Sequence, residues 1–302
     1  MTKKWLCQTP DPPRIPVFYK LTKIHKPTPV GGPIISGCDG PTERISSFVD
    51  YILQPIAKSQ KSYLMDTKDF INFVEKTKVP HNTIIMVSLD VTSLYTNIPQ
   101  EEGIETVCKA YATFYQGETP IPTNALRKML RLILQENSFQ FCGRDYLQTH
   151  GTAMGTKMAV AFANIFMPTV ETEIINKSKT KPLEWKRYIN GIFSLWDTTK
   201  EEIDLFILEA NRHHTTIKFM ANISEKATNF LDTTVFKDER FYEESILDIR
   251  THLKPTETFQ YLYFSSCHAP GVAKGFIKGE ALRLLRTNSS KVLFEESINN
   301  FN

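Results

Sequence analysis

The segment 83–91, TIIMVSLDV, is almost entirely apolar or β-branched. A run of this kind, without the polar alternation of a half-exposed strand, predicts a strand that is buried on both faces of a sheet. Its only charged residue is Asp90. A buried ionised carboxylate needs a partner, so Asp90 is either a structural carboxylate that caps a neighbouring turn or a metal ligand at the end of the strand.

The rest of the chain carries strong signals of both helix and strand. Apolar spacing near 3.6 and helix-start residues predict helices over 41–59, about 99–114, 123–135 and 199–213, and a long apolar helix within 151–178. Strands are predicted over 216–224 and 229–241, and a hairpin over 139–148 that turns near Cys142 and Gly143. The block 247–290 predicts a strand, an aromatic segment and a closing basic helix.

A second hairpin is predicted over 185–196, WKRYINGIFSLW. Asn190 and Gly191 stand between two runs of aromatic and β-branched residues, which is one of the strongest short-range hairpin signals. Both residue types accept positive φ without strain, so we expect them at the centre of a type I′ turn.

The charge is distributed unevenly, although the formal net charge of +3 is modest for 302 residues. Residues 1–30 contain six Lys or Arg against one acid, and residues 254–291 contain six against two. Two basic ends could form the walls of a groove for a phosphate backbone, because each neutralised phosphate releases counterions. A solvated surface explains the same distribution equally well.

The composition argues against several other classes of protein. The five cysteines are odd in number, scattered and without CxxC spacing, so neither a disulfide scaffold nor a structural zinc site is expected. No apolar run reaches the roughly 18 residues that a membrane span needs. We therefore expect an intracellular protein of the nucleus or cytoplasm with no membrane partner.

Five segments together resemble the reverse transcriptases of the Penelope-like retroelement group. In chain order they are KIHKP, SLDVTSLYTNIP, GTAMGTKMA, FANIFM and QYLYFSSCHAP, and the resemblance covers about residues 18–289. It implies an α+β right-hand polymerase fold of fingers, palm and thumb, in which helices pack on an antiparallel palm sheet. The implied boundaries are 1–80 for the fingers and basic N-terminal segment, 81–240 for the palm with finger elements inserted around 116–150, and 241–302 for a thumb-like segment.

The resemblance also implies a reaction and a set of site residues. Members of this group are RNA-directed DNA polymerases. They extend a DNA primer or hybrid duplex on an RNA template, using dNTPs and two Mg²⁺ ions. Asp90 would be the first metal ligand, Tyr95 the aromatic gate at the sugar 2′ position, and Met154 and Gly155 the turn beneath the incoming nucleotide. Nucleic-acid contacts would come from Lys20, Lys23, Lys26 and Tyr188. Ordinary core packing is the alternative for Tyr95 and Met154.

The chain departs from the group at the second hairpin. The group carries Tyr-x-Asp-Asp, whereas this chain has Tyr188, Ile189, Asn190 and Gly191. An amide cannot supply the negative charge that Mg²⁺ prefers, and Asp197 is roughly 20 Å further along an extended strand. The sequence therefore predicts a degenerate metal site at Asn190 and Gly191 and an enzyme that is inactive or severely impaired. A relaxed turn without crowded charges also predicts a fold at least as stable as that of an active relative.

Several alternatives stay open at this point. Gly32 replaces an Arg, and Val160 a Pro, of the group, and each weakens the case for turnover. The chain could be a non-catalytic nucleic-acid-binding protein, or a weak polymerase that uses Asp90 with Asn190. Lys218 could donate a proton to pyrophosphate or lie at the surface, and Asp232 is expected to cap the NFLD turn. The sequence does not indicate an oligomeric state.

Overall fold

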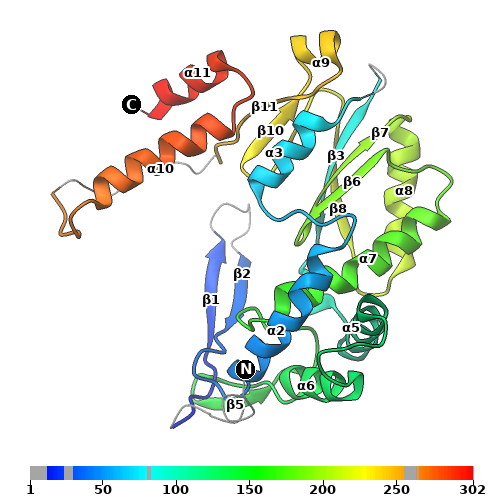
Figure 1. The fold of residues 1–302 in the computed structure, drawn as a ribbon, viewed down its shortest axis with the longest axis vertical. Helices are drawn as coiled ribbons and strands as arrows, with labels where there is room; N and C mark the ends of the chain where they lie inside the picture. Colours follow the sequence, from blue (N-terminus) through cyan, green and yellow to red (C-terminus); the bar gives the residue numbers. More distant parts are fainter. Residues whose placement is uncertain (1–11, 24–29, 80–82, 255–262, 264, 302) are drawn as a thin grey trace. The chain divides into compact units, whose positions relative to one another are not determined.

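The computed structural model describes residues 12–23, 30–79, 83–254, 263 and 265–301 (Figure 1). The chain forms two compact units, and each is assembled from three stretches of sequence. Unit 1 contains Met1–Tyr63, Asp90–Lys181 and Asp204–Met220, and unit 2 contains Leu64–Leu89, Pro182–Ile203 and Ala221–Asn302. The implied boundaries of fingers, palm and thumb describe function rather than compactness, and they stay a prediction.

A four-stranded sheet has the order β6-β7-β3-β8. Its strands are β3 (Ile85–Val91), β6 (Glu184–Tyr188), β7 (Gly191–Trp196) and β8 (Phe219–Ser224). The predicted strand at 83–91 and the predicted hairpin at 185–196 are both confirmed. β3 lies between β7 and β8, and its consecutive residues Ile85, Met86 and Val87 are all buried, so both faces of the strand are covered there, as its apolar run predicts.

The remaining elements of unit 2 cover this sheet or extend from it. They are α3 (Thr67–Lys76), β9 (Ala227–Phe230), β10 (Thr233–Phe236), α9 (Glu239–Glu244), β11 (Asp248–Thr251), α10 (Val272–Arg286) and α11 (Lys291–Phe301). Three aromatic rings tie α3 to β7 and β9: the ring centroid of Phe70 lies 5.1 Å from that of Phe193 and 4.6 Å from that of Phe230. They belong to a buried apolar cluster that holds the unit together.

The sequence predicted one strand running into a charged turn over 229–241. The structure instead has two strands followed by a short helix. Strands β9 and β10 pair antiparallel, with Phe230 opposite Thr233, and the chain reverses at Leu231, whose φ is 53°. The turn expected at NFLD is present, but a strand period alone does not indicate that β10 returns antiparallel along β9. The predicted strand and basic helix of the C-terminal block are confirmed as β11 and α10, while most of the aromatic segment lies outside the described residues.

Unit 1 is mainly helical. It contains β1 (Phe18–Lys23), β2 (Val30–Ile35), α2 (Glu43–Lys58), α4 (Leu94–Asn97), α5 (Gln100–Tyr115), α6 (Thr123–Gln135), β4 (Ser138–Phe141), β5 (Arg144–Leu147), α7 (Ala159–Lys177) and all but the start of α8 (Lys200–His213). The predicted helices at 41–59, 99–114, 123–135 and 199–213 and the hairpin at Cys142 and Gly143 are confirmed.

Helix α7 is the centre of unit 1, and α2 and α5 pack against it (Figure 1). Its apolar residues are buried on nearly all sides, as a helix of this composition requires. Gly103 permits the close approach of α5, because a Cβ there would lie 2.5 Å from the Cζ atom of Phe162. Among the described residues, no helix combines the length and the apolar character that a membrane crossing requires.

Candidate functional site

Asp90 is the next-to-last residue of β3, and its side chain is exposed. The prediction of a buried carboxylate is therefore wrong. Leu89 and Val91 are buried while Asp90 projects from the other face of the strand, where water or a ligand can reach it. An exposed carboxylate carries little of the burial penalty that a buried one would.

A short loop joins β3 to α4 and brings Tyr95 against the segment 151–158, which we call the glycine loop. The backbone N–H of Thr152 donates a hydrogen bond of 2.7 Å to the carbonyl of Tyr95. Gly151 has a φ of +67°, and a Cβ there would lie 2.5 Å from the Cα of Thr96. Only glycine permits this contact between backbones.

The side chain of Gln100 fixes the same junction. Its amide donates hydrogen bonds of 3.0 Å to the carbonyls of Gly151 and Leu134. The amide thus joins the start of α5 to the glycine loop and to the end of α6. Nothing in the sequence indicated this role, since a glutamine in the first turn of a helix is ordinary.

The far end of the glycine loop is held by β2 and α2. The N–H of Ile35 donates a 3.0 Å hydrogen bond to the carbonyl of Met154, and Gly155, with a φ of +125°, lies directly against the carbonyl of Ile35. Unit 1 therefore brings Tyr95 together with the glycine loop, which contains Met154 and Gly155. The predicted long helix starts only at Ala159, because these contacts hold residues 151–158 in a non-helical conformation.

Two side chains of α2 complete the support of the loop. The Oγ of Ser46 accepts a 3.1 Å hydrogen bond from the N–H of Met158, and Lys157 forms an ion pair of 3.0 Å with Glu43. The hydrogen bond from Lys157 lowers the pKa of Glu43 below its ordinary value, so this carboxylate is charged at neutral pH. The loop is thus fixed at both ends.

The predicted nucleic-acid contacts of the basic segment are only partly described. Lys20 lies in β1, and its aliphatic stem occupies the space that a side chain at Gly31 of β2 would fill. Glycine at 31 thus leaves room for the lysine. The side chain of Lys23 and all of Lys26 lie outside the described residues.

In unit 2, the turn between β6 and β7 is not the predicted type I′ turn. Tyr188 pairs with Gly191, so the two-residue loop is Ile189 and Asn190. Among residues 188–191, all of which the structure describes, Ile189 alone has positive φ, at 55°. A β-branched residue is strained there, so the turn is not relaxed and the argument for extra stability loses its basis.

Buried groups of unit 2 hold this turn in place. Arg187 is fully buried, and its Nη1 donates a 3.1 Å hydrogen bond to the carbonyl of Ile189. The carbonyl of Arg187 accepts a 2.9 Å hydrogen bond from the N–H of Leu64. Sequence reasoning missed Arg187, although its position in β6, in phase with Trp185, was a usable signal of an inward orientation.

The turn lies at a defined edge of the sheet. Ser194 of β7 donates a 3.4 Å hydrogen bond to the carbonyl of Val87, and Thr83 donates one of 3.1 Å to the carboxylate of Asp197. The later residue, Asp197, thus contacts the earlier residue of the β3 segment, Thr83, and Ser194 contacts Val87. Partner numbers that change in opposite directions show that β7 and β3 are antiparallel neighbours. β7 therefore begins at the edge toward which β3 runs.

The polymerase fold implies a pair of Mg²⁺ ions, and the donor set of this chain does not fit such a pair. Of the predicted ligands, Asp90 is a carboxylate, Asn190 offers a neutral amide and Gly191 has no side chain. Within the described residues, no three His, Cys, Asp or Glu side chains gather in a way that could hold a metal ion. Two hard divalent cations need more anionic oxygen than this.

Two further predicted positions have structural roles in this chain. Lys218 donates hydrogen bonds of 2.6 and 2.7 Å to the carbonyls of Asn211 and His214, so its ammonium group caps the end of α8. The carboxylate of Asp232 accepts a 3.2 Å hydrogen bond from Thr67 at the start of α3. It thereby links the turn between β9 and β10 to α3.

Comparison with solved structures defines the class of fold. No protein-family model and no curated protein sequence matches the chain. The telomerase of Candida albicans, solved with a fragment of telomeric RNA, matches with a TM-score of 0.61 at 8% identity over 93% of this chain and 50% of that one. A truncated apo telomerase of Candida tropicalis matches with a TM-score of 0.54 at 11% identity over 78% of this chain and 55% of that one.

A viral enzyme has the same architecture. The RNA-dependent RNA polymerase of a human picobirnavirus matches with a TM-score of 0.51 at 9% identity, over 74% of this chain and 43% of that one. The chain spans about half the length of the telomerases it matches. These likenesses confirm the predicted α+β right-hand polymerase fold, which reverse transcriptases and RNA polymerases share.

Proposed function

We propose that this chain is a reverse-transcriptase-like domain of the Penelope-like retroelement group that binds nucleic acid and nucleotide but is catalytically inactive or severely impaired. The turn between β6 and β7 carries the proposal. It keeps a strained conformation at one edge of the central sheet, yet it presents Asn190 and Gly191 where the group has carboxylates. The turn is present, but it lacks the two carboxylates of the group.

The organisation of unit 1 supports nucleotide binding. The backbone of Tyr95 contacts the start of the glycine loop, Gly155 lies within the loop against Ile35, and Gln100 and Ser46 fix the loop by hydrogen bonds. A loop fixed in this way requires little further ordering when a dNTP binds. We propose Tyr95, Met154 and Gly155 as its contacts.

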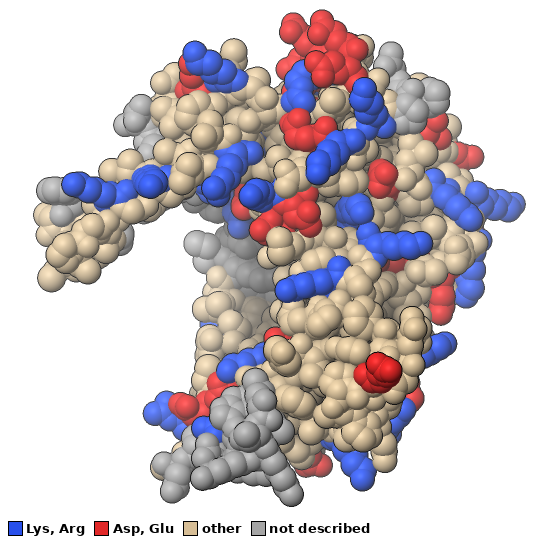
Figure 2. Space-filling model, in the orientation of Figure 1, with Lys and Arg blue, Asp and Glu red and all other residues tan. Residues whose placement is uncertain are grey.

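The distribution of basic residues supports nucleic-acid binding. Helix α10 carries Lys274, Lys278, Arg283 and Arg286 against one acid, Glu280, and blue side chains follow this helix in Figure 2. We propose that α10, Lys20 and Tyr188 contact an RNA template and DNA primer or their hybrid duplex. Telomerase, a structural neighbour, was solved with RNA.

The impairment follows from the missing charge. In this fold, the metal pair activates the primer hydroxyl and stabilises the leaving pyrophosphate. With Asp90 as the one carboxylate among the proposed ligands, we expect weak Mg²⁺ binding. The loss of several kcal/mol of transition-state stabilisation corresponds to several powers of ten in rate.

The direct test is to restore both carboxylates with Asn190→Asp and Gly191→Asp and to compare primer extension with the unaltered chain. A Cβ at Gly191 would lie 3.3 Å from the ring of Phe230, so a small ring shift accommodates the side chain. We expect the restored protein to extend a primer at least about 100-fold faster. Adding Asp90→Ala to it should abolish that activity.

Two results would contradict the proposal. Equal activity in the unaltered and restored proteins, sensitive to Asp90→Ala in both, would identify a live polymerase. No activity in either, together with no binding of primer and template, would reject a polymerase-derived function for this fold. Gly32→Arg in the restored background tests whether the second departure from the group also limits the rate.

The basic face of α10 favours a second candidate, a non-catalytic nucleic-acid-binding protein. It predicts binding of a primer–template duplex whose affinity falls as salt rises, because bound counterions are released. Replacing Lys274 and Lys278 by Ala should weaken binding and flatten its salt dependence by about one unit per lost phosphate contact. Binding unaffected by this change would exclude α10 as the contact surface.

A further inference from the structure

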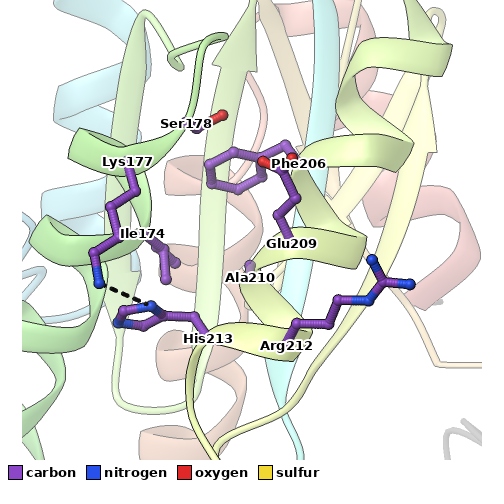
Figure 3. A pocket seen from close by; sticks show the side chains of 8 residues that line it. All are labelled: Ile174, Lys177, Ser178, Phe206, Glu209, Ala210, Arg212 and His213. Carbon is purple, nitrogen blue, oxygen red and sulfur yellow. Dashed lines mark hydrogen bonds between the residues drawn. The ribbon is translucent and has the colours of Figure 1, made fainter.

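A cavity of about 320 Å³ lies between the last turns of α7 and α8 in unit 1, and we call it the α7–α8 pocket (Figure 3). Its apolar floor consists of Ile174, Phe206 and Ala210, all at most 5% exposed. The rim is polar and comes from both helices. Neither Asp90 nor the glycine loop contributes to its lining, so the pocket is separate from the candidate nucleotide site.

The walls of the pocket are fixed in position. Lys177, at the end of α7, can only donate, so its 3.4 Å hydrogen bond makes Nδ1 of His213 an acceptor (Figure 3). The Nε2–H of His213 then donates across 2.9 Å to Glu173. The end of α8 is also tied to β8, because the side chain of Asn211 forms hydrogen bonds of 3.0 and 2.7 Å with the backbone of Phe219. A pocket fixed in this way pays little ordering entropy on binding.

The surroundings of the pocket carry an excess of positive charge. Lys177 and Arg212 line it, and Lys179 and Lys181 follow directly in the segment KSKTK; the side chains of all four are exposed. Among the acids, Glu209 lines the pocket, Glu173 bonds to His213, and Glu201 and Glu202 lie in the first turn of α8. A ligand that matches this rim is negatively charged.

An exposed apolar stripe adjoins the pocket. Leu205 and Leu208 of α8 are 53% and 47% exposed, and Glu209 and Arg212 of the pocket continue the same helical face at i, i+3, i+4 and i+7. Leucines on a solvated helix face, next to a preformed apolar pocket, mark a surface that another chain can cover.

We propose that the α7–α8 pocket and the stripe of Leu205 and Leu208 form a docking site for an acidic segment of a partner protein, which inserts one bulky apolar side chain into the pocket. The volume is near the lower end of the range of about 300–1,000 Å³ for ligand sites, which suits a side chain better than a nucleotide. The buried apolar floor gives a phosphate backbone nothing to bind. The acidic residues of the segment pair with Lys177, Lys179, Lys181 and Arg212.

The experiment uses a short fluorescent glutamate-rich peptide with leucine and phenylalanine at helical i, i+4 spacing, titrated with the full chain and followed by anisotropy. We expect micromolar binding that a peptide of equal charge, with serine in place of the apolar residues, does not show. Lys177→Glu with Arg212→Glu should weaken binding about tenfold or more. Leu208 is 47% exposed, so we expect Leu208→Ser to fold and to weaken binding independently.

The matched control is Lys58→Glu with Lys128→Glu, which changes the charge equally at exposed positions of α2 and α6. It should leave binding within about twofold of the unaltered protein, the small effect expected of distant exposed charges. Circular dichroism verifies that each variant is folded. Failure of the apolar peptide to bind better than the serine peptide overturns the proposal. The proposal is also overturned if the control variant weakens binding as much as Lys177→Glu with Arg212→Glu does. It is overturned as well if an RNA oligonucleotide displaces the peptide through the same four basic residues.

Discussion

Ile189 shows how buried groups can hold a single residue in a strained conformation. Its φ of 55° is a strained value for a β-branched side chain, which costs about 1–3 kcal/mol. Burial of Arg187 and its hydrogen bond to the Ile189 carbonyl stabilise that conformation. The buried guanidinium of Arg187 therefore supports the shape of the turn.

The strain at Ile189 can be measured by comparing two substitutions. At ordinary φ values alanine is more stable than glycine, whereas at positive φ the order reverses. We expect Ile189→Gly to be about 1 kcal/mol more stable than Ile189→Ala, measured by urea denaturation. The same pair at the neighbouring strand residue Ile192 should show the ordinary order. An alanine variant more stable than the glycine variant at 189 would mean that the turn adopts negative φ in solution.

The buried guanidinium of Arg187 should be among the most sensitive polar groups of unit 2. Arg187→Met fills similar space but removes the donor to Ile189, so we expect a loss of about 2–3 kcal/mol in the free energy of unfolding. Lys200→Met, at an exposed position at the start of α8, serves as the control and should change stability by less than about 0.5 kcal/mol. Equal stability of both variants would show that the turn does not depend on Arg187.

At the scale of elements, the loop between α10 and α11 ties both helices to the edge strand β11. Ser289 donates its N–H to the carbonyl of Ile249 at 2.8 Å, and the N–H of Thr251 donates to the side chain of Asn288 at 3.2 Å. Ser289 also donates its hydroxyl to Asp248, a carboxylate that is 3% exposed. The loop thereby covers an edge that would otherwise be open to pairing with another chain.

Asp248 gives this attachment a pH dependence. Burial raises the pKa of Asp248 above its usual value, although Ser289 and Arg240 act in the opposite direction. A raised folded-state pKa favours the protonated form, so the contribution of Asp248 to stability falls as pH rises from the unfolded pKa of about 3.9 through the folded pKa. Asp248→Asn removes this titration. We expect the variant to gain stability relative to the unaltered protein as pH rises through that window, measured by urea unfolding across pH 3.5–7. A constant difference would show that Asp248 does not titrate there.

The elements that the sequence predicted are those with strong local periodicity. Helix α6 was predicted at its observed bounds, and β3 within two residues. Helix α3 was missed although Asp66 caps it through the N–H of Asp69, a local signal that was present in the sequence. The sequence predicted a turn at Met154 and Gly155 and a long helix within 151–178, but not where that helix starts, because the shape of the glycine loop depends on backbone contacts with Tyr95 and Ile35, which are remote in sequence.

At the scale of the whole molecule, the order of motifs predicted the fold where pairwise identity could not. The three solved polymerases described above are at most 11% identical to this chain over the regions compared. Tyr95 and Gly155 are 60 positions apart, so no local pattern could have joined them to one loop, and only the resemblance supplied that expectation. Tyr95 contacts the glycine loop and Gly155 belongs to it. Both are brought together because α4, β2 and α2 of unit 1 pack around this loop.

Magnesium provides the last prediction, because a ligand that binds only the folded state stabilises the whole molecule. With Asn190→Asp and Gly191→Asp, the site should bind Mg²⁺. At a free Mg²⁺ concentration ten times its Kd, binding raises the free energy of unfolding by about 1.4 kcal/mol. We expect Mg²⁺ to raise the Tm of the restored protein and EDTA to reverse the shift, whereas the unaltered protein should show neither effect. Asp90→Ala in the restored background should remove most of the shift, since the pair of added carboxylates would lack its third anionic partner. An equal Tm shift in the unaltered protein would mean that Asp90 and an amide suffice to hold the ion.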